Sequence, residues 1–109
     1  MKSVTWVGDS RQAVKGFAPV ARQRVGRQLA RAQDGLEPED WKPMPSIGIG
    51  VKELRVREGS AYRLVYVAKF SEAIYVLHAF EKKSRKTSKS DIDLARTRFR
   101  ALVNERKMR

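Results

Sequence analysis

The sequence predicts an α+β fold in which an antiparallel meander of strands packs against helices. Within residues 51–80, apolar and polar side chains alternate with period two in segments separated by short turns. Residues 10–34 and 88–109 instead repeat apolar side chains at helical spacing. A chain of 109 residues can bury one modest core. We therefore expect a single domain, residues 1–109, with the element order β-α-α-β-β-β-α.

The first third of the chain is expected to form a short strand and two helices. Residues 3–7 alternate like a strand, and Asp9 stands three residues before Gln12, the spacing of a capping box at a helix start. A second helix follows Pro19, because proline is favoured in the first turn. It should end near Gly35, which can adopt the left-handed cap conformation. Its apolar stripe is flanked by Arg22, Arg24, Arg27 and Arg31.

Residues 36–50 contain three prolines and no clean period, which predicts a loop, pinned by Trp41. The strand after it, 51–57, places Leu54 and Val56 on an apolar side, opposite a charged side. The next strand, 62–70, alternates in the same way after a short turn. Short connections of this kind predict antiparallel neighbours.

The third strand of the meander, 74–80, is apolar on both faces, which is typical of a central strand covered on both sides. The last helix should begin at Ser88, which has capping-box spacing to Asp91. Its apolar stripe is formed by Ile92, Ala95, Phe99, Leu102 and Val103. Four arginines lie outside that stripe and are either a solvated face or an extension of a basic surface: Arg96, Arg98, Arg100 and Arg106.

The charge balance indicates an anionic partner. The chain carries 24 Lys and Arg against 12 Asp and Glu, a formal charge of +12, which points to RNA, DNA or an acidic protein. It contains no cysteine and one histidine, which excludes disulfides and zinc sites built on sulfur or on a histidine cluster. We expect no cofactor and no metal. No run resembles a secretory signal or a membrane span, so we expect a cytoplasmic protein without membrane contact.

The first candidate site is the charged side of strand 51–57. Glu53, Arg55 and Arg57 alternate there, and Arg63 should face them across the turn. Alternate residues on a strand lie about 7 Å apart, close to the spacing of successive phosphates, so these guanidinium groups suit a nucleic-acid backbone. A plain charged outer face, with Glu53 neutralising an arginine, explains the same pattern.

The second candidate site is the segment "HAFEKKSRKT", residues 78–87, where the apolar strand gives way to cations. Loops at strand ends often build sites, and a helix start follows. Phosphate contacts are expected from Lys82, Lys83, Arg85 and Lys86. Phe80 suits either stacking on a base or a place in the core. His78 is a candidate for proton transfer, but alternation places it on the face of Ile74, Val76 and Phe80, so a hydrogen-bonded histidine in or near the core explains it at least as well.

The stretches "GSAYRLVY" and "AIYVLHAFEKKSRKT" resemble the RelE/ParE superfamily of bacterial toxins, and within it the phage-derived HigB-like branch. The resemblance covers residues 50–100 strongly and the earlier part weakly. It implies a RelE-like single sheet packed against helices. It also implies the toxin of a type II toxin-antitoxin system, bound as a hetero-oligomer by a cognate antitoxin, HigA-like and of helix-turn-helix type.

RelE-like and HigB-like relatives cleave mRNA on the ribosome without a metal, through attack of a 2′-hydroxyl on its own 3′ phosphate. The resemblance implies that this chain is such an endoribonuclease, which arrests translation. Arg63 matches the family's strand arginine at the scissile phosphate, Arg55 and Arg57 match basic positions, and Glu53 lies near a carboxylate base. Lys82 stands where relatives place an arginine, or a catalytic histidine and tyrosine.

The chain departs from the family pattern because no tyrosine follows that strand, and Thr87 or Ser88 stands near a tyrosine position of some relatives. The general acid and base therefore stay unassigned. Two alternatives stay open: inhibition of DNA gyrase, as in ParE-like relatives, and non-catalytic binding of nucleic acid.

Overall fold

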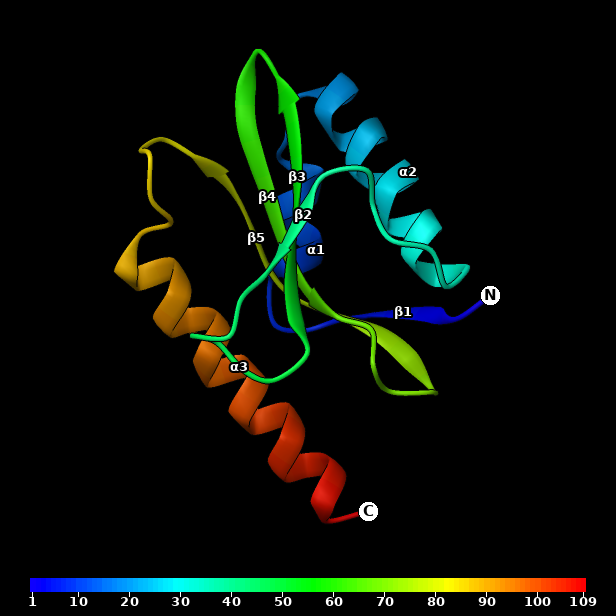
Figure 1. The fold of residues 1–109 in the computed structure, drawn as a ribbon. Helices are drawn as coiled ribbons and strands as arrows, with labels where there is room; N and C mark the ends of the chain where they lie inside the picture. The colour runs from blue at the N-terminus through cyan, green and yellow to red at the C-terminus, as the bar shows by residue number, and fades with distance from the viewer.

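The computed structural model describes the whole chain, residues 1–109, as a five-stranded mixed sheet with three helices (Figure 1). The strands are β1 (Ser3–Trp6), β2 (Trp41–Pro43), β3 (Val51–Glu58), β4 (Ser60–Val67) and β5 (Ala73–Lys82), and the helices are α1 (Ser10–Lys15), α2 (Pro19–Gln33) and α3 (Lys89–Lys107). The predicted α+β class is confirmed, and the predicted elements occur in the predicted order. No helix combines the length and the apolar character needed to cross a bilayer.

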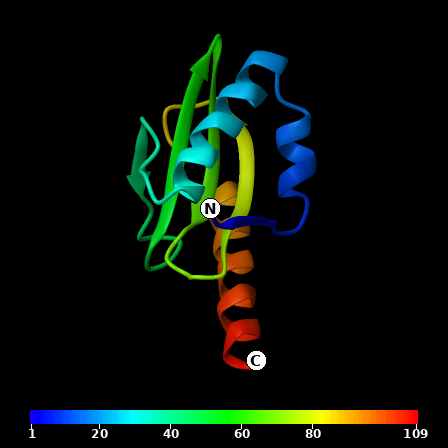
Figure 2. The same cartoon turned by 90° about the vertical axis from the view of Figure 1, so that its right-hand side faces the viewer.

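The strand order in the sheet is β1-β5-β4-β3-β2. The predicted meander is β3-β4-β5, all antiparallel, and β1 pairs in parallel with β5. In Figure 1 the sheet lies between α2 and α3, and Figure 2 shows α3 extending past the end of the sheet toward the C-terminus. Each face of the meander is therefore covered by helix, which explains why β5 is apolar on both sides.

Two hydrophobic clusters hold these layers together. The first joins α1 and α2 to one face of the sheet and includes Val14, Ala21, Val25, Leu29, Leu54, Val56, Tyr62, Leu64, Tyr66, Ile74 and Val76. The second joins α3 to the other face and includes Val51, Val65, Val67, Tyr75, Leu77, Ala95, Phe99 and Leu102. The predicted alternation of β3 and β4 is confirmed, because their alternate residues fall into different clusters.

A bulge in β5 changes which face its last residues occupy. Val65 of β4 pairs with His78, but the next residue, Tyr66, pairs with Val76, so Leu77 is the extra residue. The prediction that His78 shares a face with Ile74 and Val76 is therefore wrong. His78 lies on the α3 face instead, which strict alternation cannot anticipate because the bulge shifts the parity of every later residue.

Two predictions for the N-terminal half need correction. The segment predicted as a loop contains the strand β2, whose residues Trp41 and Lys42 pair with β3 at the edge of the sheet. Asp9 stands at the N-cap position of α1, but its side chain does not cap the helix. Its carboxylate instead accepts a hydrogen bond from Arg98 at 2.7 Å, which lowers the pKa of the Asp9 carboxyl. A partner 89 residues away leaves no local signal in the sequence.

The start of α3 is confirmed: the Ser88 hydroxyl caps the helix by accepting a hydrogen bond from the Asp91 backbone N–H. Three of the four arginines outside its apolar stripe tie the helix to the rest of the chain. Arg96 donates to the Ser46 carbonyl, Arg98 to the Leu77 carbonyl, and Arg106 pairs with Glu72. These arginines are therefore neither simply solvated nor part of a free basic surface.

Candidate functional site

The α3 face of the sheet has a polar half beyond the apolar part that α3 covers. The pairing registers place its residues in three rows across the strands. One row is Lys42, Glu53, Val65 and His78, the next is Arg55, Arg63 and Phe80, and the third is Arg57, Ala61 and Lys82. Neighbouring rows on one face are about 7 Å apart. The registers thus bring both candidate segments of the sequence to one surface.

Glu53 lies at the centre of this surface and has no exposed area. Its Oε1 atom is 3.3 Å from the Nε atom of Arg63 and 3.6 Å from the Nε atom of Arg55. Thr87, in the loop before α3, donates a hydrogen bond from its hydroxyl to Glu53 Oε2 at 3.2 Å. A buried carboxylate is costly unless it is paired, so Glu53 holds the two arginines and the loop together.

The contacts of Glu53 with Arg55 and Arg63 are ion pairs without hydrogen-bond geometry. Glu53 Oε1 and the Nε atoms of Arg55 and Arg63 are buried, and none of them has a hydrogen-bond partner. The distances of 3.3 and 3.6 Å also exceed those of well-formed charge-assisted bonds, about 2.7–2.9 Å. The two Nε atoms are therefore shielded from solvent and held to Glu53 by charge, and Arg55, with 28% of its side chain exposed, is the more accessible of the two arginines.

The electrostatic environment of the cluster changes the acidity of two cations. Burial lowers the pKa of the Arg63 guanidinium, and the Glu53 carboxylate opposes that shift. Desolvation, and after it the charge of Arg63, lowers the pKa of the Lys82 ammonium. Desolvation, with a smaller contribution from Arg63, thus makes the Lys82 ammonium a stronger acid than an ordinary lysine, and shifted pKa values are common at functional sites.

The loop between β5 and α3, residues 83–88, forms one wall of a groove of about 380 Å³, and β2 forms the other. The charged residues lining this groove are Lys42, Lys82, Arg85 and Lys86, and no carboxylate lines it. Lys83 does not line this groove, and its Nζ atom lies 3.8 Å from Glu81. The groove is therefore a path of uncompensated positive charge that runs to the cluster around Glu53.

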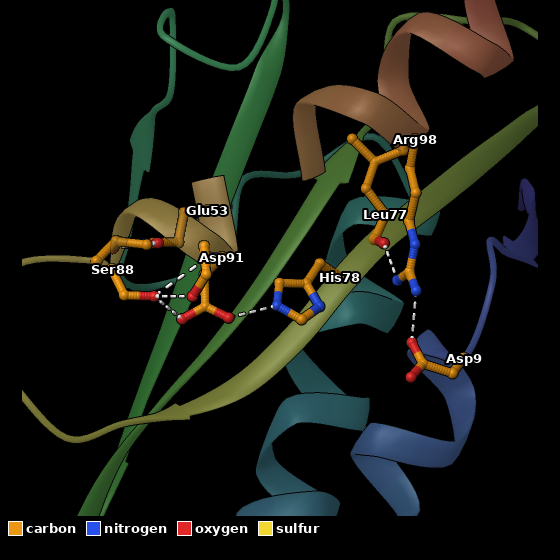
Figure 3. Close-up of polar contacts among 9 residues, drawn as sticks. Asp9, Glu53, Leu77, His78, Ser88, Asp91 and Arg98 are labelled. Carbon is orange, nitrogen blue, oxygen red and sulfur yellow. Dashed lines mark hydrogen bonds and ion pairs between the residues drawn. The ribbon is translucent and has the colours of Figure 1, made fainter. Parts of the chain in front are cut away.

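His78 is held by the first turn of α3 (Figure 3). Its Nε2 atom lies 2.7 Å from Oδ1 of Asp91, and the Ser88 hydroxyl donates to the other oxygen of that carboxylate at 2.6 Å. The imidazole stacks on the ring of Phe80 with centroids 5.1 Å apart. Nδ1 is buried without a partner, so the imidazole is not in contact with solvent at that atom.

Among the residues predicted for the site, Glu53, Arg55, Arg63 and Lys82 come together, with Arg57 and Phe80 in adjoining positions. Arg85 and Lys86 line the groove, whereas Lys83 leans toward Glu81. Sequence reasoning missed Lys42 as part of this surface, and it missed the bond from Asp91 to His78. Lys42 left no signal because its strand has only three residues. No group of acidic or histidine side chains is placed to hold a metal ion.

The chain matches a known protein family. The sequence pattern of the family described as phage-derived protein Gp49-like (DUF891) matches residues 12–100, which is most of the chain. The chain belongs to the Gp49-like family. This family is of the RelE toxin-like type, in agreement with the coarser part of the sequence resemblance. No curated protein matches the chain. The matched range of this Gp49-like protein includes every residue of the polar rows described above.

Proposed function

We propose that this Gp49-like protein is the toxin of a type II toxin-antitoxin system and that it cleaves mRNA on the ribosome without a metal. The observation that supports this proposal best is the pair of arginines, Arg55 and Arg63, held over a buried Glu53. A phosphate at this position would meet guanidinium donors that need no rearrangement of the sheet. Preorganised donors of this kind stabilise the charge that develops in a transition state.

The reaction uses groups of the chain and of the RNA, with solvent water as the acceptor of the 2′ proton. The 2′-hydroxyl gives its proton to a water molecule, the 2′-oxygen forms a bond to the adjacent phosphorus, and the bond from phosphorus to the 5′-oxygen breaks. The products are a 2′,3′-cyclic phosphate and a 5′-hydroxyl. Arg63 and Arg55 stabilise the equatorial oxygens, and Lys82 donates the proton that the leaving 5′-oxygen takes up. The lowered pKa of Lys82 makes its ammonium a better acid than an ordinary lysine.

Glu53 acts in this scheme as a positioning residue. Because it has no exposed area, it reaches no substrate atom in this arrangement. Its carboxylate fixes the two arginines and, through Thr87, the loop that carries Arg85 and Lys86. The base that takes the 2′ proton is not assigned to a side chain.

The excess of cationic side chains supports two parts of the proposal: the ribosome as the target and an antitoxin as the partner. With 24 basic and 12 acidic side chains the chain favours a strongly anionic environment such as ribosomal RNA. Between encounters with ribosomes, an antitoxin that covers the same surface would offset this charge. We expect that antitoxin to be encoded beside the toxin and to form a hetero-oligomer with it.

Induction of the protein in growing cells tests the proposal. Primer extension on a translated mRNA should show new 5′ ends within minutes in the wild type and none with Arg63→Ala. Lys82→Gln provides a second variant, because Lys82 is partly exposed and its replacement does not disturb the core. Arg100→Gln, an exposed change on α3, is the matched control and should cut like the wild type.

The same cells distinguish the competing activities. If growth stops but no mRNA is cut, the endonuclease proposal fails. Loss of supercoiling activity by purified DNA gyrase in the presence of the protein would then identify a ParE-like inhibitor. If growth continues unchanged, the protein is no toxin, and salt-dependent RNA binding alone would identify a nucleic-acid-binding protein.

A further inference from the structure

A second, smaller pocket of about 230 Å³ is lined by residues from the end of β5, loop 83–88 and the first turn of α3. Its lining includes Phe80, Ser88, Asp91, the three lysines Lys82, Lys83 and Lys86, and Glu81, whose carboxylate lies 3.8 Å from the Nζ atom of Lys83. We propose that this pocket binds a single unpaired nucleotide of the RNA and selects bases whose edge carries hydrogen-bond donors. The inference rests on the proposed function, since it names the part of the RNA that the site would read.

Phe80 provides the platform on which a base would stack. One side of its ring is backed by the imidazole of His78, at a centroid distance of 5.1 Å and an interplanar angle of 26°. His78 is fixed in turn by Asp91, as Figure 3 shows. Phe80 is only partly buried and lines the pocket. An aromatic ring supported from behind loses little freedom when a base stacks on it, and such stacking accepts any base.

Asp91 provides the selection. Its side chain is 27% exposed, and each carboxylate oxygen already has a partner, one in His78 and the other in Ser88. An ionised carboxylate is only an acceptor and has about four lone-pair sites, so acceptor sites remain for a ligand. Guanine presents adjacent N1–H and N2–H donors on its Watson–Crick edge. Uracil presents one N–H between two carbonyl oxygens, which a carboxylate repels.

The lysines define where the phosphate of that nucleotide would lie. Lys82 and Lys86 line both the pocket and the larger groove, so they stand between the two depressions. A nucleotide held in the pocket would therefore place its phosphate near Lys82, beside Arg63. The pocket is smaller than sites for drug-sized ligands, about 300–1,000 Å³, which suits one base rather than an extended ligand.

The single histidine of the chain makes a direct binding assay possible. The ring resonances of His78, recorded by NMR, should move when guanosine 5′-monophosphate stacks on Phe80. We expect guanosine monophosphate to bind at least fivefold more tightly than uridine monophosphate. Phe80→Leu should weaken both nucleotides about fivefold or more. Asp91→Asn should abolish the preference for guanosine, and Lys86→Gln, an exposed change, should weaken both nucleotides equally. Phe70→Leu is the matched control and should bind like the wild type.

Three results would overturn the inference: His78 signals that do not respond to either nucleotide, equal affinity of the wild type for both nucleotides, or unchanged binding by Phe80→Leu. Equal affinity would identify contacts to the phosphate alone. The assay needs neither a ribosome nor cleavage, so its outcome is independent of the endonuclease test. If the protein binds guanosine monophosphate as expected but cuts no mRNA, the nucleotide pocket stands and the endonuclease proposal fails.

Discussion

At the scale of single residues, the most informative side chain is Glu53, a buried carboxylate. It is a carboxylate without exposed surface in a chain that has twice as many cations as anions. Its neighbours Arg63 and Arg55 are themselves largely buried, with 10% and 28% of their side chains exposed. A buried ion pair adds little to stability by itself, but removing one partner leaves an uncompensated charge. Glu53 therefore links the stability of the sheet to the arrangement of the site.

The substitution Glu53→Gln tests this link. It keeps the shape of the side chain and removes the charge, so we expect a loss of about 3 kcal/mol in the free energy of unfolding. Urea denaturation followed by circular dichroism measures this loss. Glu37→Gln is the control, because Glu37 pairs with Lys52 at a position where its side chain is 48% exposed, and it should cost less than about 1 kcal/mol. Equal costs for the two substitutions would contradict the central position of Glu53.

Lys82 gives a second prediction at the residue scale. Desolvation and the charge of Arg63 lower its pKa below the ordinary value of 10.5. NMR titration of the lysine Nζ signals should place the Lys82 midpoint below 10.5, and Arg63→Gln should move it upward. Arg24→Gln, which alters a distant pair with Glu58, should leave it unchanged. A Lys82 midpoint at or above 10.5, or one unmoved by Arg63→Gln, would argue against this environment.

The altered pKa values of Lys82 and Tyr66 make the free energy of unfolding depend on pH. The folded chain releases the Lys82 proton at a lower pH than the unfolded chain does, so this group makes the fold more stable as pH rises toward 10.5. Tyr66 acts in the opposite sense, because burial raises its pKa above the ordinary value of 10.0. Above about pH 10 the unfolded chain loses the Tyr66 proton first, and the fold becomes less stable.

At the scale of elements, α3 decides the form of the functional face. Arg98 donates to the Leu77 carbonyl at the β5 bulge at 2.8 Å and holds Asp9 with the same guanidinium (Figure 3). The first turn of α3 binds His78 through Asp91. The helix thus supports the bulge that turns His78 toward the polar rows, and any change that unseats α3 should disturb the site as well as the core.

Two glycine substitutions should change the stability in opposite directions: one tests the packing of α3 at Phe99, and the other lies in α2 and serves as a comparison. A Cβ atom at Gly48 would lie 2.2 Å from the Phe99 ring, so Gly48→Ala should cost about 1–3 kcal/mol of unfolding free energy. Gly26 lies within α2, where a Cβ atom would meet nothing within 4 Å. Gly26→Ala should therefore stabilise the chain by about 0.5–1 kcal/mol. Urea midpoints that shift in the same direction for both variants would contradict the packing described here.

At the scale of the whole molecule, the sequence predicts the layers better than the site. The alternation around Leu54 and Val56 and the capping pair of Ser88 and Asp91 are local signals, and the structure confirms both. The placement of Arg63 on the same face as Arg55 also followed from a short turn, which Gly59 makes with a φ of +74°. These predictions succeed because neighbouring residues decide them.

The features that escaped prediction depend on residues far apart in the chain. Because β5 is apolar on both faces, its sequence gives no period that could reveal a bulge at Leu77. The strand β2 is three residues long and contains Pro43, so only its pairing with β3 defines it. Lys42 and the Asp9 to Arg98 pair are likewise set by tertiary contacts. Sequence motifs therefore indicated most residues of the polar rows, whereas tertiary contacts set their arrangement relative to one another.

The distribution of charge predicts how RNA binding depends on salt. For a single strand, the logarithm of affinity should fall with the logarithm of salt concentration by about 0.7 per phosphate contact. Replacing both Arg85 and Lys86 by glutamine should make the slope shallower by about 1.4. The matched control is Arg11→Gln with Lys15→Gln, which removes the same charge from α1 on the other face of the sheet. If both double variants give the same slope, the groove is no preferred path for RNA.

The most direct test of the central claim is cleavage of mRNA on programmed ribosomes by the purified protein. The wild type should cut the bound message and leave a cyclic phosphate and a 5′-hydroxyl, which labelling by polynucleotide kinase detects without prior removal of phosphate. Arg63→Ala and Lys82→Gln should leave the message intact, and Arg100→Gln should cut it. An intact message with the wild type, or the same cuts with Arg63→Ala, would contradict the claim that the arginines over Glu53 form the active site.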